Sequence, residues 1–137
     1  MLIKTLYLLT LVVWGEAPQL LGPAHQEDGA CLVADVFMNW LKTPEYAGDP
    51  QRLAEDRFWG WQRDLPPQPE WLFRIVCECV ENPGATTGAD FVYSRQDLTS
   101  NGWTWHKATA HAGSGTYALY TFREIPEPFP EWDKLER

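Results

Sequence analysis

The segment that most restricts how this chain can fold is an apolar run that begins at Leu2 and ends at Trp14. Its few polar side chains do not leave one face of a helix to water, so the run predicts a helix buried in the core. A helix that crosses a bilayer needs about 20 consecutive apolar residues, and this run is shorter. Gly15 and then the carboxyl group of Glu16 follow at once, so this acid lies at the end of the predicted helix.

Three interpretations of Glu16 follow from the sequence. Lys4 and the apolar run resemble the start of a secretory signal peptide, with Glu16 just beyond the cleavage site, although Pro18 is a poor residue to cut beside. In the second interpretation, Glu16 is an ordinary solvated residue at the start of a loop. In the third, the negative end of the helix dipole and the indole of Trp14 raise the pKa of Glu16, which a general acid at neutral pH requires.

The remaining sequence predicts further helices and then a small antiparallel sheet, which is a mostly helical α+β fold within a single domain. Apolar periodicity and helix-capping signals place helices at residues 2–14, 29–43, 49–56 and 69–82. Alternating patterns place strands at residues 89–94, 102–109 and 115–124. We expect a domain over residues 1–123 and an extended, proline-rich acidic strap over residues 124–137.

The aromatic content and the charge limit the partners of the protein. Eight Trp, five Tyr and six Phe residues favour a surface that stacks on flat ligands such as sugars, although cores use the same residues. The formal net charge of −8 disfavours nucleic acid as a partner, because neutralising phosphate groups needs a basic face. Recognition of an anionic cell envelope would then depend on hydrogen bonds and stacking.

The three cysteines, Cys31, Cys77 and Cys79, are an odd number, and no Cys-x-x-Cys motif or neighbouring His suggests a zinc site. On one helix, Cys77 and Cys79 would point about 200° apart, which makes them a poor pair for a disulfide or a metal. We therefore expect three reduced, buried thiols, no metal, and folding in a reducing compartment.

Four blocks of the sequence, in this order, resemble the spore cortex-lytic type of cell wall hydrolases. Gly-Glu-Ala at 15–17 is similar to the motif that closes the first helix in that family, and the stretch 32–36 with Asn39 is similar to its second helix. The aromatic FWGWQ at 58–62 and NPGATTGADFVYS at 82–94 resemble the third and fourth blocks. The matching positions of the last block are Thr87, Gly88, Ala89, Phe91 and Tyr93. Together, the blocks extend over nearly the whole chain.

The resemblance implies a lysozyme-like fold that cleaves the glycan strands of peptidoglycan as a lytic transglycosylase. The family's single catalytic acid carries over to Glu16, which would protonate the glycosidic oxygen between N-acetylmuramic acid and N-acetylglucosamine and then accept the proton of the muramic 6-hydroxyl. Such an enzyme needs no metal, no cofactor and no second carboxylate, because the attacking hydroxyl belongs to the substrate. If a partner carboxylate exists, the candidates are Glu27, Asp28 and Asp90.

Five further residues are candidates for binding the glycan. Thr87 and Tyr93 would hydrogen-bond an acetamido group or the catalytic carboxyl, or would instead serve a turn and a strand. Trp59 and Trp61 would stack on sugar rings, or would pack in the core. Gln62 would orient an N-acetyl group, or would be an ordinary polar residue of a loop.

The sequence departs from the family in three places. The loop after Glu16 is longer, Trp40 stands where the family usually has Arg, and a C-terminal Gly-x-His motif lacks its His, so that Tyr117 or Tyr120 is left to take its place. These departures keep a second function open, that of a non-catalytic glycan-binding or structural domain. We expect a protein without a membrane span, made in the cytoplasm without a clear cleavable signal and acting at the bacterial cell wall, as a phage endolysin does.

Overall fold

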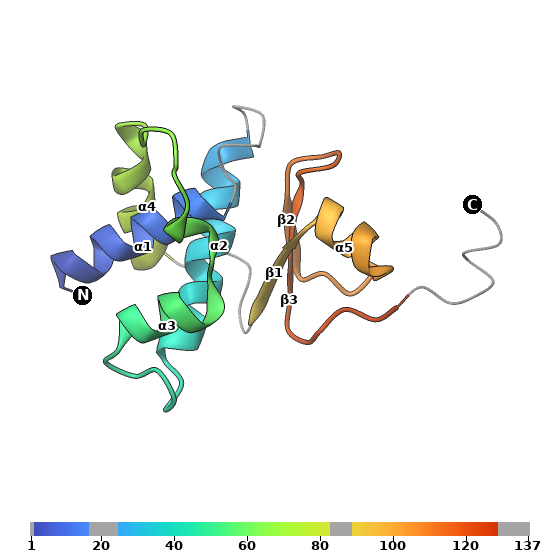
Figure 1. Ribbon diagram of the computed structural model, residues 1–137, viewed down its shortest axis with the longest axis horizontal. Helices are drawn as coiled ribbons and strands as arrows, with labels where there is room; N and C mark the ends of the chain where they lie inside the picture. Colours follow the sequence, from blue (N-terminus) through green and yellow to red (C-terminus); the bar gives the residue numbers. More distant parts are fainter. Residues whose placement is uncertain (1, 17–24, 83–88, 129–137) are drawn as a thin grey trace.

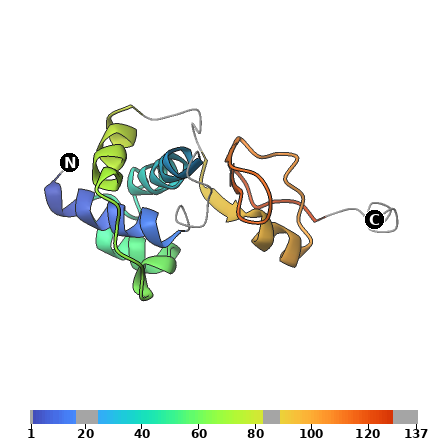
Figure 2. The same ribbon diagram turned by 90° about the horizontal axis from the view of Figure 1, so that it is seen from above.

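The computed structural model describes residues 2–16, 25–82 and 89–128, and it has the predicted α+β architecture. Four helices form one layer, and a three-stranded antiparallel sheet with a fifth helix on its outer side forms the other (Figures 1 and 2). The helices are α1 (Ile3–Gly15), α2 (Gln26–Leu41), α3 (Pro50–Arg57), α4 (Trp71–Glu81), α5 (Arg95–Asn101) and the short 3-10 helix η3 (Gly60–Gln62). The strands are β1 (Phe91–Ser94), β2 (Ala110–Ala112) and β3 (Leu119–Phe122).

The apolar run forms α1, as predicted, but only its second half is buried. Leu9 and Val12 are fully enclosed, whereas Leu2 and Tyr7 are 78% and 58% exposed. The first turns extend beyond the neighbouring helices (Figure 1), and the ring of Tyr7 stacks on that of Phe73 in α4. The prediction of a helix buried on all sides is therefore wrong for the N-terminal half, because a helix at the edge of a small domain has neighbours along only part of its length.

The central helix of the molecule is α2, which contacts the other three helices of its layer on one side and the sheet on the other (Figure 1). Val33 and Phe37 are completely buried between them. The helix begins at Gln26, earlier than the predicted residue 29, with the exposed acids Glu27 and Asp28 in its first turn. Acidic side chains stabilise that turn because they complement the positive end of the helix dipole.

The predictions for α3 and α4 are confirmed. The side chain of Asp49 accepts a hydrogen bond from the backbone N–H of Arg52 at 3.1 Å, and Pro50 occupies the first helical position, which needs no donor. α4 begins at Trp71 and buries one apolar face against α1 and α2.

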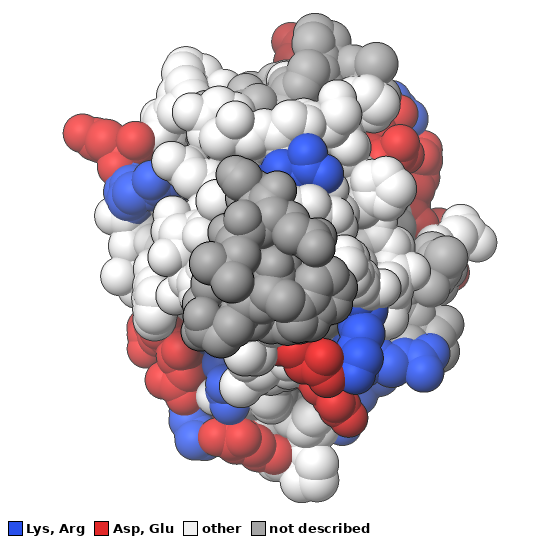
Figure 3. Space-filling view, turned by 90° about the vertical axis from the view of Figure 1, so that its right-hand side faces the viewer, with Lys and Arg blue, Asp and Glu red and all other residues white. Residues whose placement is uncertain are grey.

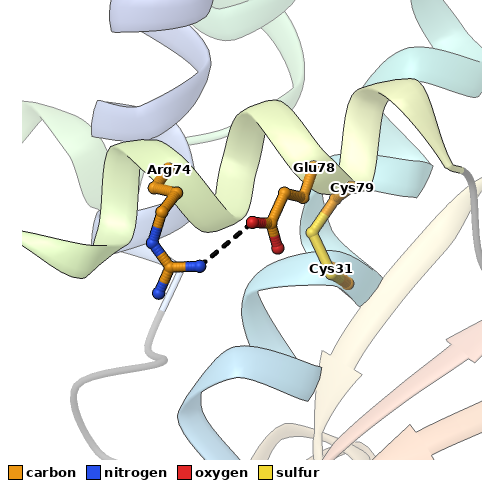
Figure 4. The surroundings of a disulfide bond; sticks show 4 residues. All are labelled: Cys31, Arg74, Glu78 and Cys79. Carbon is orange, nitrogen blue, oxygen red and sulfur yellow. Dashed lines mark hydrogen bonds and ion pairs between the residues drawn. A yellow bond between two sulfur atoms is a disulfide. The ribbon is translucent and has the colours of Figure 1, made fainter.

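A disulfide bond between Cys31 of α2 and Cys79 of α4 joins two helices of this layer (Figure 4). The prediction of three reduced thiols is therefore wrong for two of them, and Cys77 alone has a free thiol. The cysteines of the bond are 48 residues apart in sequence, and the packing of α2 against α4 brings their Cα atoms to 5.3 Å. The expected reducing compartment rested on three reduced thiols, so that expectation loses its basis.

The sheet has the strand order β1-β3-β2, with both pairs antiparallel and Tyr93 opposite Tyr120. Two hydrogen bonds from α2 fix the chain where it enters β1: the side-chain amide of Asn39 donates to the carbonyl of Ala89 at 2.7 Å, and the indole of Trp40 donates to the carbonyl of Asp90 at 2.6 Å. The first strand is thereby held at a defined position relative to the helical layer.

The segment after β1 differs from the prediction. Ser94 accepts a hydrogen bond from the backbone N–H of Asp97 and so caps α5, which Gly102 ends in a left-handed conformation with φ of 69°. Residues 102–109 do not form the predicted strand, since β2 begins only at Ala110. The alternation of aromatic and polar residues in this stretch instead places Trp103 and Trp105 in a small core between α5 and the sheet.

The first residues of the predicted strap lie against the sheet layer. The backbone N–H of Thr104 donates to the carbonyl of Glu127 at 2.8 Å, and Trp103 forms an isolated bridge with Pro128. The strap beyond Pro128 falls outside the described residues. On the face that carries α5, basic and acidic side chains of the described residues are interspersed (Figure 3). Within the described ranges, no helix is long and apolar enough to cross a membrane.

Candidate active site

A cavity of about 690 Å³ lies between the helical layer and the sheet layer. The ends of α1 and α3 and the helix η3 line one wall, and β1, the first turn of α5 and the turn before β3 line the other. Four acids are among the lining residues, namely Glu16, Asp56, Asp90 and Asp97.

Two glycines allow the end of α1 and the helix η3, which form the wall that carries Glu16, to lie in direct contact. Gly15 at the end of α1 lies directly against Gly60 of η3, and a Cβ atom on Gly60 would overlap the carbonyl of Gly15. A Cβ atom on Gly15 would overlap the backbone of Gly60 and Trp61. This contact requires glycine at both positions, and it brings the backbone N–H of Gly60 to 3.4 Å from Oε1 of Glu16. Arg63 strengthens the contact by donating to the carbonyl of Gly15 at 3.1 Å.

Glu16 is partly buried, so it is not the ordinary solvated residue of the second interpretation. Burial is the largest effect on its pKa and raises it above the ordinary value of 4.5. Hydrogen bonds from the backbone of Gly60 and Trp59 and the positive charge of Arg63 oppose this rise, whereas the negative charge of Asp97 adds to it. The net shift is upward, so Glu16 retains its proton to a higher pH than an exposed glutamate.

Tyr93 lies on the opposite wall, on β1, half-buried and lining the cavity. Burial raises the pKa of its phenol, and the charge of Asp97 raises it further, so the hydroxyl remains a hydrogen-bond donor. Its ring meets Trp103 edge-on at 5.3 Å between ring centres, which fixes its direction.

Of the other predicted binding residues, some line the cavity and some do not. Trp59 lines the cavity and is 75% exposed, so its indole is available for stacking. Trp61 is partly buried against the helical core, where its N–H donates to the carbonyls of Ala54 and Phe58, and it does not line the cavity. Gln62 is exposed and does not line the cavity. Thr87 lies outside the described residues.

Tyr117 and Tyr120 are the two candidates to replace the His of the Gly-x-His motif that the sequence lacks, and the structure places them differently. Tyr117 lines the cavity and is exposed. Tyr120 does not line the cavity: it is buried on the same face of the sheet as Tyr93, in the small core beside α5, and its hydroxyl accepts a hydrogen bond from Arg95 at 2.7 Å. The ring of Trp40 is covered by the guanidinium of Arg57, 4.1 Å from its centre, so α3 supplies a positive charge at the cavity.

Of the predicted partner acids, Asp90 lines the cavity, whereas Glu27 and Asp28 do not. Asp97 was missed because residues 95–101 carry no apolar periodicity. The signal that could have found it is the spacing from Ser94 to Asp97, which is typical of a helix start and places an acid in the first turn.

The arrangement can donate a proton to a leaving group from a sheltered carboxyl, opposite a phenol and beside an exposed indole. Groups of three or more His, Cys, Asp or Glu that could hold a metal do not occur in the part of the chain that the structure describes. No protein-family model, no curated protein and no solved structure matches the chain.

Proposed function

We propose that this protein cleaves the glycan strands of peptidoglycan as a lytic transglycosylase, with Glu16 as its catalytic acid and then base, and that its two layers form a lysozyme-like fold. The observation that carries the proposal is the position of Glu16, sheltered at the end of α1 in the wall of a cavity of about 690 Å³, with its pKa raised by burial. Acids that protonate a glycosidic oxygen near neutral pH share that property.

In the proposed reaction, Glu16 donates its proton to the glycosidic oxygen as the bond from that oxygen to C1 of N-acetylmuramic acid breaks. The 6-hydroxyl oxygen of the same sugar bonds to C1, and its proton passes to the carboxylate of Glu16. The products are a 1,6-anhydromuramic end and a free 4-hydroxyl on N-acetylglucosamine, and the acid is restored. Neither a metal nor a cofactor takes part in these steps.

Three side chains around the cavity would bind the strand. The exposed indole of Trp59 would stack on a sugar ring, and the hydroxyl of Tyr93 would donate to an acetamido carbonyl or to the carboxylate of Glu16. Tyr117, on the turn before β3, would contact the strand from the same side as Tyr93.

The test is a digest of purified peptidoglycan with the wild type and with Glu16→Gln, its products identified by mass spectrometry. Glu70→Gln is the matched control, because Glu70 is exposed and lies away from the cavity. We expect anhydromuramic ends from the wild type and the control and none from Glu16→Gln, with all three proteins equally folded by circular dichroism. Binding of the glycan without any cleavage by the folded wild type would refute the enzyme and favour a glycan-binding domain.

A further inference from the structure

We propose that Asp97 is a second catalytic residue, a general base that activates a water molecule against C1 of the bound muramic sugar, so that this protein releases hydrated as well as anhydro ends. The inference rests on the proposed function, since it assigns a second outcome to the same bound glycan.

The two carboxyl groups lie on opposite walls of one cavity. Glu16 stands at the end of α1 in the helical layer, and Asp97 stands in the first turn of α5 in the sheet layer. A cavity of about 690 Å³ separates the layers, which is room for a sugar and a water molecule between the walls. Acid and base on opposite sides of the ring, with a gap for water, is the arrangement of an inverting glycosidase, whose carboxyl groups are about 6.5–9.5 Å apart.

The fold uses the backbone of Asp97 but not its carboxylate. The N–H donates to the hydroxyl of Ser94 at 3.1 Å, and the carbonyl accepts from the side chain of Asn101 at 2.8 Å. The carboxylate is exposed and, within the described ranges, has no hydrogen bond or ion pair to satisfy it. A water molecule in the cavity is therefore free to bind it.

Other acids of the cavity are less suited to this role. The carboxylate of Asp56 accepts a hydrogen bond from Tyr46 and pairs with Arg52. Of the described acids, Asp97 is the one whose charge raises the pKa of Glu16, and the same charge raises the pKa of Tyr93. Asp97, Glu16 and Tyr93 all line the cavity, and a negative charge near the other two groups has this effect on their pKa values.

The hydrolytic step balances without any other reactant. The carboxylate of Asp97 takes a proton from water as the water oxygen bonds to C1, on the face opposite the leaving group. The bond from C1 to the glycosidic oxygen breaks, and that oxygen takes the proton of Glu16. The products are a reducing muramic end of inverted configuration and a free 4-hydroxyl, and exchange with solvent returns one proton from Asp97 to Glu16.

The test compares the ratio of hydrated to anhydro ends from wild type, Asp97→Asn and the control Asp64→Asn, in ¹⁸O-labelled water so that each hydrated end is identified by its mass. Asparagine preserves the backbone contacts of α5 but cannot take a proton. We expect both kinds of end from the wild type and from Asp64→Asn, and hydrated ends reduced about 100-fold, with anhydro ends still formed, from Asp97→Asn.

Three results would overturn the inference: anhydro ends alone from the wild type, an unchanged ratio in Asp97→Asn, or an equal loss of both ends in the folded variant. A failure of the proposed function is a different result, because the wild type would then yield no cleavage products of either kind, whatever stands at position 97.

Discussion

The disulfide bond between Cys31 and Cys79 allows the sharpest test of the fold. The double variant Cys31→Ala/Cys79→Ala removes the bond and leaves the packing of α2 against α4 otherwise in place. Cys77→Ala is its matched control, because this thiol lies on the same helix and takes no part in the bond. We expect the double variant to be much less stable than the wild type and the control to be nearly unchanged.

The magnitude follows from the length of chain that the bond closes. A separation of 48 residues lowers the entropy of the unfolded chain by about 14 cal/mol/K in the chain-entropy model, which is about 4 kcal/mol at 25 °C. A chain of 137 residues has an unfolding entropy of about 290 cal/mol/K, so the loss corresponds to a fall in Tm of about 14 °C. Disulfides often contribute less than the chain-entropy model gives, and a contribution of about 2 kcal/mol would lower Tm by about 7 °C.

Urea unfolding followed by tryptophan fluorescence measures the free energy directly, for oxidised wild type, wild type in reductant, the double variant and the control. Denatured wild type without reductant should show one reactive thiol, that of Cys77. Three reactive thiols would show that the bond does not form, and equal unfolding midpoints with and without reductant would refute the entropic argument.

Three other predictions concern the candidate site. Glu16→Gln should stabilise the protein at neutral pH. The folded state holds the Glu16 proton to a higher pH than the unfolded chain, so the free energy of unfolding of the wild type falls as the pH rises from 4.5 through the raised pKa. In urea titrations, the variant should therefore be more stable than the wild type at pH 7 and equally stable at about pH 3. Gly60→Ala should cost about 1–3 kcal/mol and reduce cleavage about 100-fold, because the added Cβ displaces Gly15 and with it Glu16; normal cleavage by this variant would contradict the close contact. Trp59→Ala should weaken glycan binding with an unchanged unfolding midpoint, whereas Trp61→Ala should lose about 3 kcal/mol of stability; the reverse pattern would exchange their roles.

The sequence predicted those parts of the fold that depend on local signals. The capped start at Asp49 and Pro50 and the strand from Phe91 to Ser94 follow from neighbouring residues alone. α5 was missed although its start signal is local, because its residues, 95–101, carry no apolar periodicity.

Features that depend on packing between elements far apart in the sequence could not be predicted from it. The disulfide pairs cysteines on different helices, and the direction of the Trp61 indole is decided by carbonyl groups at the end of α3. At the site, Glu16 was predicted at the end of its helix and burial raises its pKa, but the hydrogen bond from Gly60 that opposes this rise depends on the contact between α1 and η3, which local signals do not reveal.

The contact between Gly15 and Gly60 limits how the shape of the cavity can be changed by mutation. Both positions already carry the smallest side chain, so no compensating exchange exists in which one residue grows while the other shrinks. The wall that carries Glu16 is therefore fixed, and a wider or narrower groove must come from side chains that project into it, such as Trp59 and Tyr117. A mutant library that reshapes the cavity should keep both glycines and vary such projecting side chains on either wall.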